Sequence, residues 1–492
     1  MAEHTGDPIT RRRFIEWAGR AGVGAAAATV LSGSALTACA RGDDDDGGGG
    51  GANDTVKVGV LAPFSGIGAF IGTITNNSLD AAVAQLNATG GIGGRKVELV
   101  KRDTGVDPTA GPKLYTELAA VQGLVGILWC GAPGLTQALP QIKRDGLPVI
   151  AVFNDLLSSG RLHPDGTDAG RSVFQMFLPE LWAKEVLADY ARNDRGYRSA
   201  ALMHDTLLDA EGTNRATFEK AFGQAGLEIK AMERFTVVDA EYGAQLQRLK
   251  AARPDVVYID GLAPNTAAIV KQLAALGASY VDTPTAKGTA WHPHIFGAPG
   301  GTGDKTWATL AGGDAKVGTV TGWHVGGLIY LPTFAIGEWM RKHTKKEPTG
   351  GEESPADGLA ALLHGMRKAG STDRAKVVNG METMGKVTFA SVPFGFDRDR
   401  HVSKTKDEVI VVTLERNGGP APTTPPYQLG REWSPGRPFT TTEAGPTQLV
   451  RPTLAANRRA HPTVMEQVLA EGYGTQCTKQ PDGSLTKECR IH

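Results

Sequence analysis

Alternating hydrophobic and polar positions open the ordered part of the chain and predict strands separated by helices. Residues 56–61 alternate with the period of a strand, and Leu79, Ala82, Val83 and Leu86 then recur at helical spacing. The same patterns continue, and they predict strands at 96–100, 124–129 and 147–153 and helices at 112–121 and 137–144.

A second series of the same kind follows an irregular segment at 154–173. It predicts helices at 180–190, 210–225, 240–252 and 266–276 and strands at 199–203, 227–235 and 255–260. The β-α-β-α order predicts parallel sheets with helices on both faces. We therefore expect an α/β fold with two doubly wound lobes joined by a hinge, and ligands of such sheets lie at the carboxyl ends of the strands.

The pattern weakens in the last third of the chain. Strands are predicted at 317–323 and 408–414, and helices at 331–343 and 355–369. Residues 418–451 are rich in Pro, Gly and Thr and are predicted to be mostly irregular.

The N-terminal segment has the features of an export signal. Three arginines, Arg11 to Arg13, precede a small and apolar run at 21–38. This run is too rich in Gly and Ala for a convincing membrane span of about 20 residues. The segment at 10–15 resembles the twin-arginine export motif. Leu36 to Cys39 resembles a lipobox, whose chemistry attaches lipid to the cysteine and cleaves before it.

A lipidated Cys39 would anchor the mature chain to a membrane surface, because acyl chains bind the bilayer through their buried CH2 groups. The alternative is that Cys39 is incidental and is discarded with the signal peptide. Asp43 to Asp46 and Gly47 to Gly51 suit a solvated, flexible tether. The predicted organisation is a signal peptide at 1–38, a tether at 39–54, lobe 1 at 55–177, lobe 2 at 178–325, a return to lobe 1 at 326–392, a return to lobe 2 at 393–416, and a Pro/Gly-rich extension at 417–492.

Composition narrows the class of partner. The chain has 492 residues with 52 basic and 52 acidic side chains, so its overall charge favours neither nucleic acid nor an electrostatic membrane partner. The 4 cysteines exclude a disulfide scaffold. Cys477 and Cys489 could pair outside the cytosol and close a short loop, but spacing alone does not establish a bond.

Two stretches carry a family resemblance. The first, 56–72, contains P-x-S-G after a strand, and the second, 77–108, contains N-x-x-G-G-I-x-G after a helix. They closely resemble the opening of the branched-chain amino acid class of extracytoplasmic solute-binding proteins, and the similarity extends over residues 55–415. The motif positions kept are Pro63, Ser65, Gly66, Asn87, Gly90, Gly91, Ile92 and Gly94.

The resemblance implies a type I periplasmic binding fold that closes on a small-molecule ligand and delivers it to the permease of an ABC importer. It implies a monomer outside the cytosol, without catalysis, cofactor or nucleic acid. The Ser/Thr-rich loop that holds the α-carboxylate in amino acid binders is replaced here by residues 130–134, CGAPG. A classical leucine-type ligand is therefore not expected, and the ligand is a small polar organic molecule of amino acid, amide or carboxylate type.

Positions matching the family's ligand contacts supply the candidate site. Gly131 and Ala132 would offer backbone N–H groups, whereas Asn154, Asp155 and Asp209 would offer side chains. Phe70 is an aromatic wall or, equally well, a rim or packing residue. Lys287 falls where the amino acid binders carry the acid that holds the amine.

Two other classes of protein compete with a solute receptor: an enzyme and a ligand-sensing or surface-interaction lipoprotein. An enzyme is not expected, because the chain lacks a G-x-S-x-G elbow, an H-E-x-x-H pair and a Walker loop. His292 and His294 could face a metal, but Pro293 restricts the pair and no neighbouring ligand completes a set, so no metal site is expected. The remaining alternative is a ligand-sensing or surface-interaction lipoprotein on the same fold, with the C-terminal extension docking a different partner.

Overall fold

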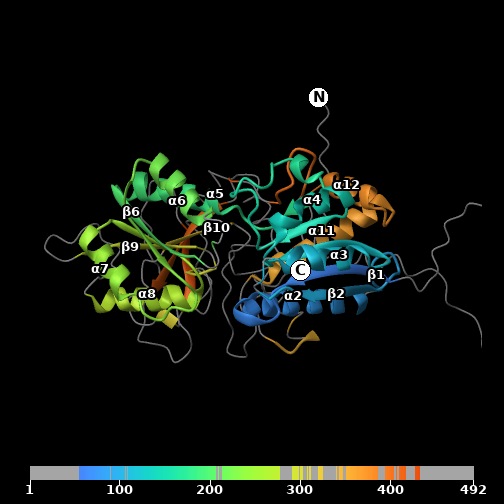
Figure 1. Cartoon of the computed structure of the whole chain (residues 1–492), viewed down its shortest axis with the longest axis horizontal. Coiled ribbons are helices and arrows are strands. Elements are labelled where there is room, and N and C mark those ends of the chain that lie inside the picture. Colours follow the sequence, from blue (N-terminus) through green and yellow to red (C-terminus); the bar gives the residue numbers. More distant parts are fainter. Residues whose placement is uncertain are drawn as a thin grey trace, which may run out of the picture.

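The chain folds into two lobes that lie side by side (Figure 1). The structure, a computed structural model, describes residues 55–432. The gaps are 89, 106, 108, 207–208, 210–212, 277–290, 299, 303–306, 308–309, 312–319, 325–339, 341–342, 347–350, 386–393, 404–405, 407–408 and 417–426.

Lobe 1 is built on a parallel five-stranded sheet in the order β2-β1-β3-β4-β5. Its strands are β1 (Val56–Ala62), β2 (Val97–Asp103), β3 (Leu124–Cys130), β4 (Val149–Val152) and β5 (Val173–Gln175). Every pairing in this sheet is parallel, so each strand needs a crossover through a helix.

Helices cover both faces of this sheet. One face carries α2 (Ala69–Ala88), α11 (Glu353–Ala369) and α12 (Arg374–Glu382), and the other carries α3 (Ala110–Ala119) and α4 (Leu135–Asp145). Figure 1 shows α11 and α12, in orange, beside the blue elements from the start of the chain. Along β3, Leu128 packs in the first core and Ile127 and Trp129 in the second, because successive side chains point to opposite faces.

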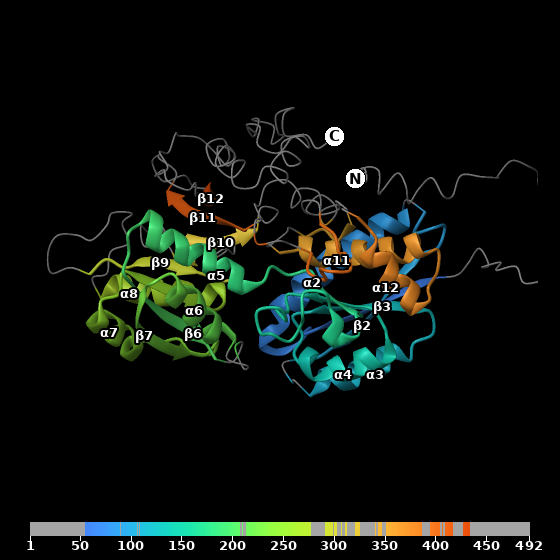
Figure 2. The same cartoon turned by 90° about the horizontal axis from the view of Figure 1, so that it is seen from above.

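Lobe 2 is built on a seven-stranded sheet in the order β12-β11-β10-β9-β8-β6-β7. The strands are β6 (Ser199–Asp205), β7 (Glu228–Phe235), β8 (Val256–Asp260), β9 (His294–Gly297), β10 (Val320–His324), β11 (Val409–Arg416) and β12 (Tyr427–Glu432). The pairs from β7 to β10 are parallel, whereas β11 and β12 are antiparallel additions at one edge (Figure 2).

The helices of lobe 2 again lie on both faces of the sheet. The faces are covered by α5 (Glu180–Asp189) with α6 (Thr213–Gln224), and by α7 (Gly243–Ala252) with α8 (Ala263–Ala275). Two parallel sheets, each with helices on both faces, confirm the predicted α/β fold with two doubly wound lobes.

Two connections between the lobes run against each other. The first leads from β5 to α5, and the second approaches β11. Gln175 donates its backbone N–H to His401 O at 2.7 Å and accepts from Ser403 N at 2.9 Å, and the Ser403 hydroxyl donates to Met176 O at 2.9 Å. Phe394 and Phe396 also pack in the core of lobe 1, so the chain still belongs to lobe 1 beyond residue 393, where the return to lobe 2 was predicted.

Several short elements differ from the expectation. Strand β5 ends the segment predicted to be irregular, β9 and α12 were not predicted, and β12 lies within 418–451, where irregular chain was expected. Most of the predicted helix at 331–343 lies outside the described residues, as do the signal segment, the tether, Cys39, Cys477 and Cys489. Within the described chain, no helix combines the length and apolar character needed to cross a membrane.

Candidate functional site

The predicted site residues lie in loops that follow the carboxyl ends of the strands. In lobe 1, Gly131 and Ala132 follow β3, and Asn154 and Asp155 come shortly after β4. In lobe 2, Asp209 lies after β6. This is the edge of a doubly wound sheet where ligands bind.

Asn154 holds the loop after β3 in place. Its Oδ1 accepts the backbone N–H of Gly131 at 2.9 Å, and its Nδ2 donates to Ala132 O at 3.1 Å. Ala132 O also accepts from the indole of Trp129 at 2.8 Å. The N–H of Gly131 and the amide of Asn154 thus have partners within the loops, and their contact with a ligand stays a prediction.

Gly131 also shows why this loop needs glycine. Its φ of 61° lies in the left-handed region, and a Cβ there would lie 2.9 Å from Ile71 Cγ2. The neighbouring loop carries a second unusual residue, Phe153, whose φ is 64° although it is not glycine. Its ring meets Phe177 edge to face, with 6.1 Å between the ring centroids. Phe70, at the start of α2, is 39 % exposed, and both of its predicted roles stay open.

Asp155 joins the two lobes. Its Oδ2 accepts the backbone N–H of Glu180, the first residue of α5, at 2.7 Å, and its Oδ1 accepts from Ser158 N at 3.0 Å and from Gln175 Nε2 at 3.1 Å. Burial raises the pKa of Asp155, and the nearby Glu180 carboxylate raises it further, against hydrogen bonds that lower it.

The N-terminal end of α5 leads to a buried lysine that the sequence analysis missed. Lys184 is 0 % exposed, and its Nζ lies 3.1 Å from both Glu180 Oε2 and Asp260 Oδ2. It also donates to Asn214 Oδ1 at 3.2 Å and to Thr217 Oγ1 at 2.9 Å. Burial alone would lower the pKa of Lys184, but Asp260 and Glu180 outweigh it and raise that pKa, so the side chain stays charged.

Asp209 continues this chain of contacts. Its Oδ1 accepts the backbone N–H of Asn214 at 2.9 Å, and its Oδ2 lies 3.2 Å from His204 Nδ1. Both side chains are almost fully buried. We name the connected set Asp155, Glu180, Lys184, Asp260, Asn214, Asp209 and His204 the junction network. It links two predicted ligand residues, one from each lobe.

The junction network holds more acid than base. Four carboxylates face one lysine and one histidine. Burial raises the pKa of Glu180, Lys184 opposes this effect, and Asp260 adds to it. An acid-rich cluster of this kind favours a ligand group that donates hydrogen bonds or carries positive charge.

The other candidates give no site. Lys287 lies outside the described residues. His294 Nδ1 lies 3.0 Å from the Tyr197 hydroxyl in the core, and the described chain contains no group of three His, Cys, Asp or Glu side chains able to hold a metal. Cys130 is buried, and burial raises the pKa of its thiol to about 12, so it is no nucleophile.

Two α/β lobes whose candidate ligand-binding loops meet at one junction define a class of two-lobed binding protein. Residues 55–419 match the family described as periplasmic binding protein, and the chain belongs to this family. The family binds solutes outside the cytoplasm and is not catalytic, which confirms the expected absence of enzyme activity.

Curated relatives match over part of their length. An amino acid binding protein of Pseudomonas aeruginosa is 25% identical over 223 residues, 45% of this chain and 58% of the relative. A Leu/Ile/Val-binding protein homolog of Brucella melitensis is 28% identical over 216 residues, 42% of this chain and 52% of the relative. The chain therefore spans little more than half the length of these relatives.

Solved structures share the fold. A type 1 periplasmic binding protein from Bordetella pertussis aligns with a TM-score of 0.62 and 19% identity, over 74% of this chain and 98% of that one. A solute-binding protein of an ABC transporter from Rhodopseudomonas palustris, in complex with 3,4-dihydroxybenzoic acid, aligns with a TM-score of 0.59 and 19% identity, over 74% and 94%. These likenesses confirm the type I periplasmic binding fold.

Proposed function

We propose that this protein is a membrane-tethered receptor that captures a small polar organic solute outside the cytoplasm and delivers it to the permease of an ABC importer. The junction network carries the proposal, because it joins Asp155 of lobe 1 to Asp209 of lobe 2 through contacts of 2.7 to 3.2 Å. A solute that contacts both lobes favours the closed form over the open one.

The ligand carries at least one hydrogen-bond donor or cationic group, and an amino acid, an amide or a related acid satisfies this requirement. The acid excess of the junction network supports this chemistry. A ligand of the size of an amino acid or an aromatic acid is also supported by the comparisons. The names of the relatives refer to amino acids, and one structural neighbour is in complex with an aromatic acid. Phe70 and Lys287 complete the set of proposed contacts.

A thermal-shift screen of the full chain in detergent tests the binding function. The compounds are amino acids, amides, ureas, short carboxylates, aromatic acids and polyamines. A ligand that binds only the folded chain at about 100 times its Kd adds ~2.7 kcal/mol to the free energy of unfolding, so the melting temperature rises.

The matched variants are Asp209→Asn, which keeps an acceptor for Asn214 N but loses the charge, and Asp189→Asn, which changes an exposed carboxylate in α5. The shift is expected to disappear in Asp209→Asn and to persist in Asp189→Asn. If folded protein responds to no compound class, solute capture is wrong and a tethered interaction or sensing module takes its place.

The tether is a separate part of the proposal. Twin-arginine export, lipidation of Cys39 and a location on the outer face of the cell membrane are inferred from the motifs at the N-terminus, and the receptor is proposed to be a monomer. Cys39→Ser is expected to move the protein from the membrane to the soluble fraction, whereas Cys477→Ser leaves it at the membrane. Equal membrane retention of both variants would contradict the lipid anchor.

A further inference from the structure

A cavity of about 630 Å³ opens in lobe 1, away from the predicted ligand loops. Ser172 lies just before β5, and Gly146 follows α4 and precedes β4, so the cavity lies at the amino ends of these strands. The predicted ligand residues lie at the opposite, carboxyl ends. Helix α12 forms the remaining wall, together with Arg398.

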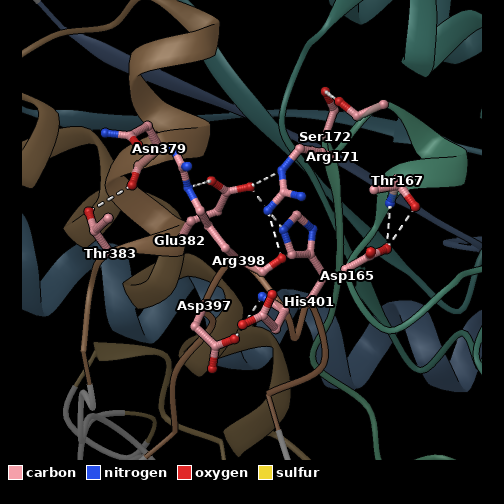
Figure 3. A network of polar contacts seen from close by, with 12 residues as sticks. Asp165, Thr167, Arg171, Ser172, Asn379, Glu382, Thr383, Asp397, Arg398 and His401 are labelled. Atoms are coloured by element: carbon pink, nitrogen blue, oxygen red, sulfur yellow. Dashed lines mark hydrogen bonds and ion pairs between the residues drawn. The ribbon is translucent and has the colours of Figure 1, made fainter.

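The carboxylates around this cavity already have partners in the protein. Glu382 is 4 % exposed at its side chain, and its Oε1 lies 2.6 Å from Arg171 Nε and 3.1 Å from His401 Nε2 (Figure 3). Asp373 caps α12 by accepting the N–H of Lys376 at 3.0 Å. Asp145 Oδ1 lies 3.4 Å from Arg144 Nε.

By contrast, the guanidinium groups of Arg171 and Arg398 have N–H donors that no described residue engages. Arg171 uses Nε on Glu382 and one Nη2 hydrogen on Arg398 O at 2.7 Å, while a guanidinium has five N–H donors. Arg398 is 70 % exposed at its side chain, and its contact with Glu382 is 3.6 Å long. Among the described residues, no hydrogen bond engages the other N–H groups of these two side chains. Figure 3 shows both converging on Glu382 from different segments.

The backbone supports a built site. Arg171 has a φ of 62°, a conformation that costs a non-glycine residue of order 1 kcal/mol or more and persists only where the surroundings impose it. Arg374 is fixed by two bonds to backbone, from Nη1 to Asp145 O at 3.1 Å and from Nη2 to Ala119 O at 3.0 Å. These contacts hold the walls of the cavity in place.

We propose that this cavity binds a small organic oxyanion, a carboxylate or a phosphate ester, through Arg171 and Arg398. Guanidinium groups match the two oxygens of such anions with paired hydrogen bonds. Asn379, which also lines the cavity, supplies a neutral hydrogen-bond donor through its amide. The volume falls within the range of about 300–1,000 Å³ typical of ligand sites, so it suits an organic molecule better than a single ion. The site does not depend on the solute-binding function proposed above.

Titration calorimetry of the full chain in detergent tests the site, with citrate as the carboxylate probe and glycerol 3-phosphate as the phosphate probe, at constant ionic strength. Three variants are compared. Arg398→Gln removes one guanidinium from an exposed position, and Ala375→Trp fills the cavity from the exposed side of α12 without changing charge. Arg215→Gln removes an exposed arginine of α6 in lobe 2 and is the matched control.

The wild-type chain and Arg215→Gln are expected to bind one of the two probes, and the probe that binds identifies the anion. Arg398→Gln and Ala375→Trp are each expected to raise its Kd at least about tenfold, while the solute found by thermal shift still binds both variants. The proposal is overturned if neither probe binds, if Arg215→Gln weakens binding as much as Arg398→Gln, or if either cavity variant binds like the wild type.

Discussion

The carboxylate of Asp155, in lobe 1, accepts a hydrogen bond at 2.7 Å from the backbone N–H of Glu180, the residue that begins the first helix of lobe 2. The first N–H groups of a helix have no partner within it. Asp155 therefore supplies, from one lobe, an acceptor that a helix of the other lobe lacks.

Asp155→Ala is expected to lower the free energy of unfolding by ~1–2 kcal/mol, because it removes an acceptor at the start of a helix. Asp155→Asn keeps one oxygen and is expected to lose less. Urea denaturation measures the change, and Asp399→Ala, at an exposed turn, is the control, expected within ~0.5 kcal/mol of wild type. Equal stability of Asp155→Ala and the control would show that the contact between the lobes contributes nothing.

Lys184→Met is expected to lower the free energy of unfolding by ~3–5 kcal/mol, because it leaves two carboxylates without their buried cation. Adding Asp260→Leu to Lys184→Met removes one of these carboxylates and is expected to restore part of the loss. Lys220→Met, on the exposed side of α6, is the control. Thermal and urea unfolding give the free energy of unfolding of the three variants. If the double variant recovers no stability, Asp260 is not the carboxylate that needs Lys184.

Gly131→Ala is expected to lower the free energy of unfolding by more than about 1 kcal/mol, because it combines a positive φ with a steric conflict against Ile71. Gly146→Ala separates the two causes, since its φ is 64° but no atom lies within 4 Å of its added Cβ. The control is therefore expected to lose less stability in urea denaturation. Equal losses would assign the whole effect to backbone conformation.

Acid is expected to destabilise the protein through His364. Burial, together with the nearby charges of Lys368 and Arg367, lowers the pKa of His364 from 6.5 to about 4. Between these values the unfolded chain takes up a proton that the folded chain does not, so the free energy of unfolding falls as the pH drops from 6.5 toward 4.

Urea denaturation at pH 7.5 and 4.5 is expected to show a smaller pH dependence in His364→Leu than in wild type, by roughly 2–3 kcal/mol in the free energy of unfolding. His163→Leu, at an exposed position, is the control and is expected to keep the wild-type dependence. An unchanged pH dependence in His364→Leu would assign the acid sensitivity to other groups.

Long periodic segments made the fold predictable, whereas short elements depend on distant partners. Strand β1 and helix α2 are regular over 7 and 20 residues, so their periods are clear. Strand β5 has 3 residues and β9 has 4, too few to establish a period. Strand β12 forms because Arg431 pairs with Thr413 of β11, and no local pattern signals that partner.

The loops that carry the candidate residues could be predicted from the sequence, but the contacts within them could not. The loops after β3 and β4 were placed correctly, yet the bond from Gly131 to Asn154 joins residues far apart in the sequence. Glu180 and Lys184, four residues apart on a predicted helix, do signal an ion pair. The other partner of Lys184 is Asp260, which lies at the end of strand β8, far away in the sequence. The burial of the lysine could therefore only be seen in three dimensions.

The bonded contact of the two connections at Gln175, His401 and Ser403 restricts how one lobe moves against the other. Sliding of these two segments past each other would break the bonds at Gln175, whereas a rotation of one lobe about this point would keep them. Such a rotation would change the distance between spectroscopic labels placed on β2 and β7.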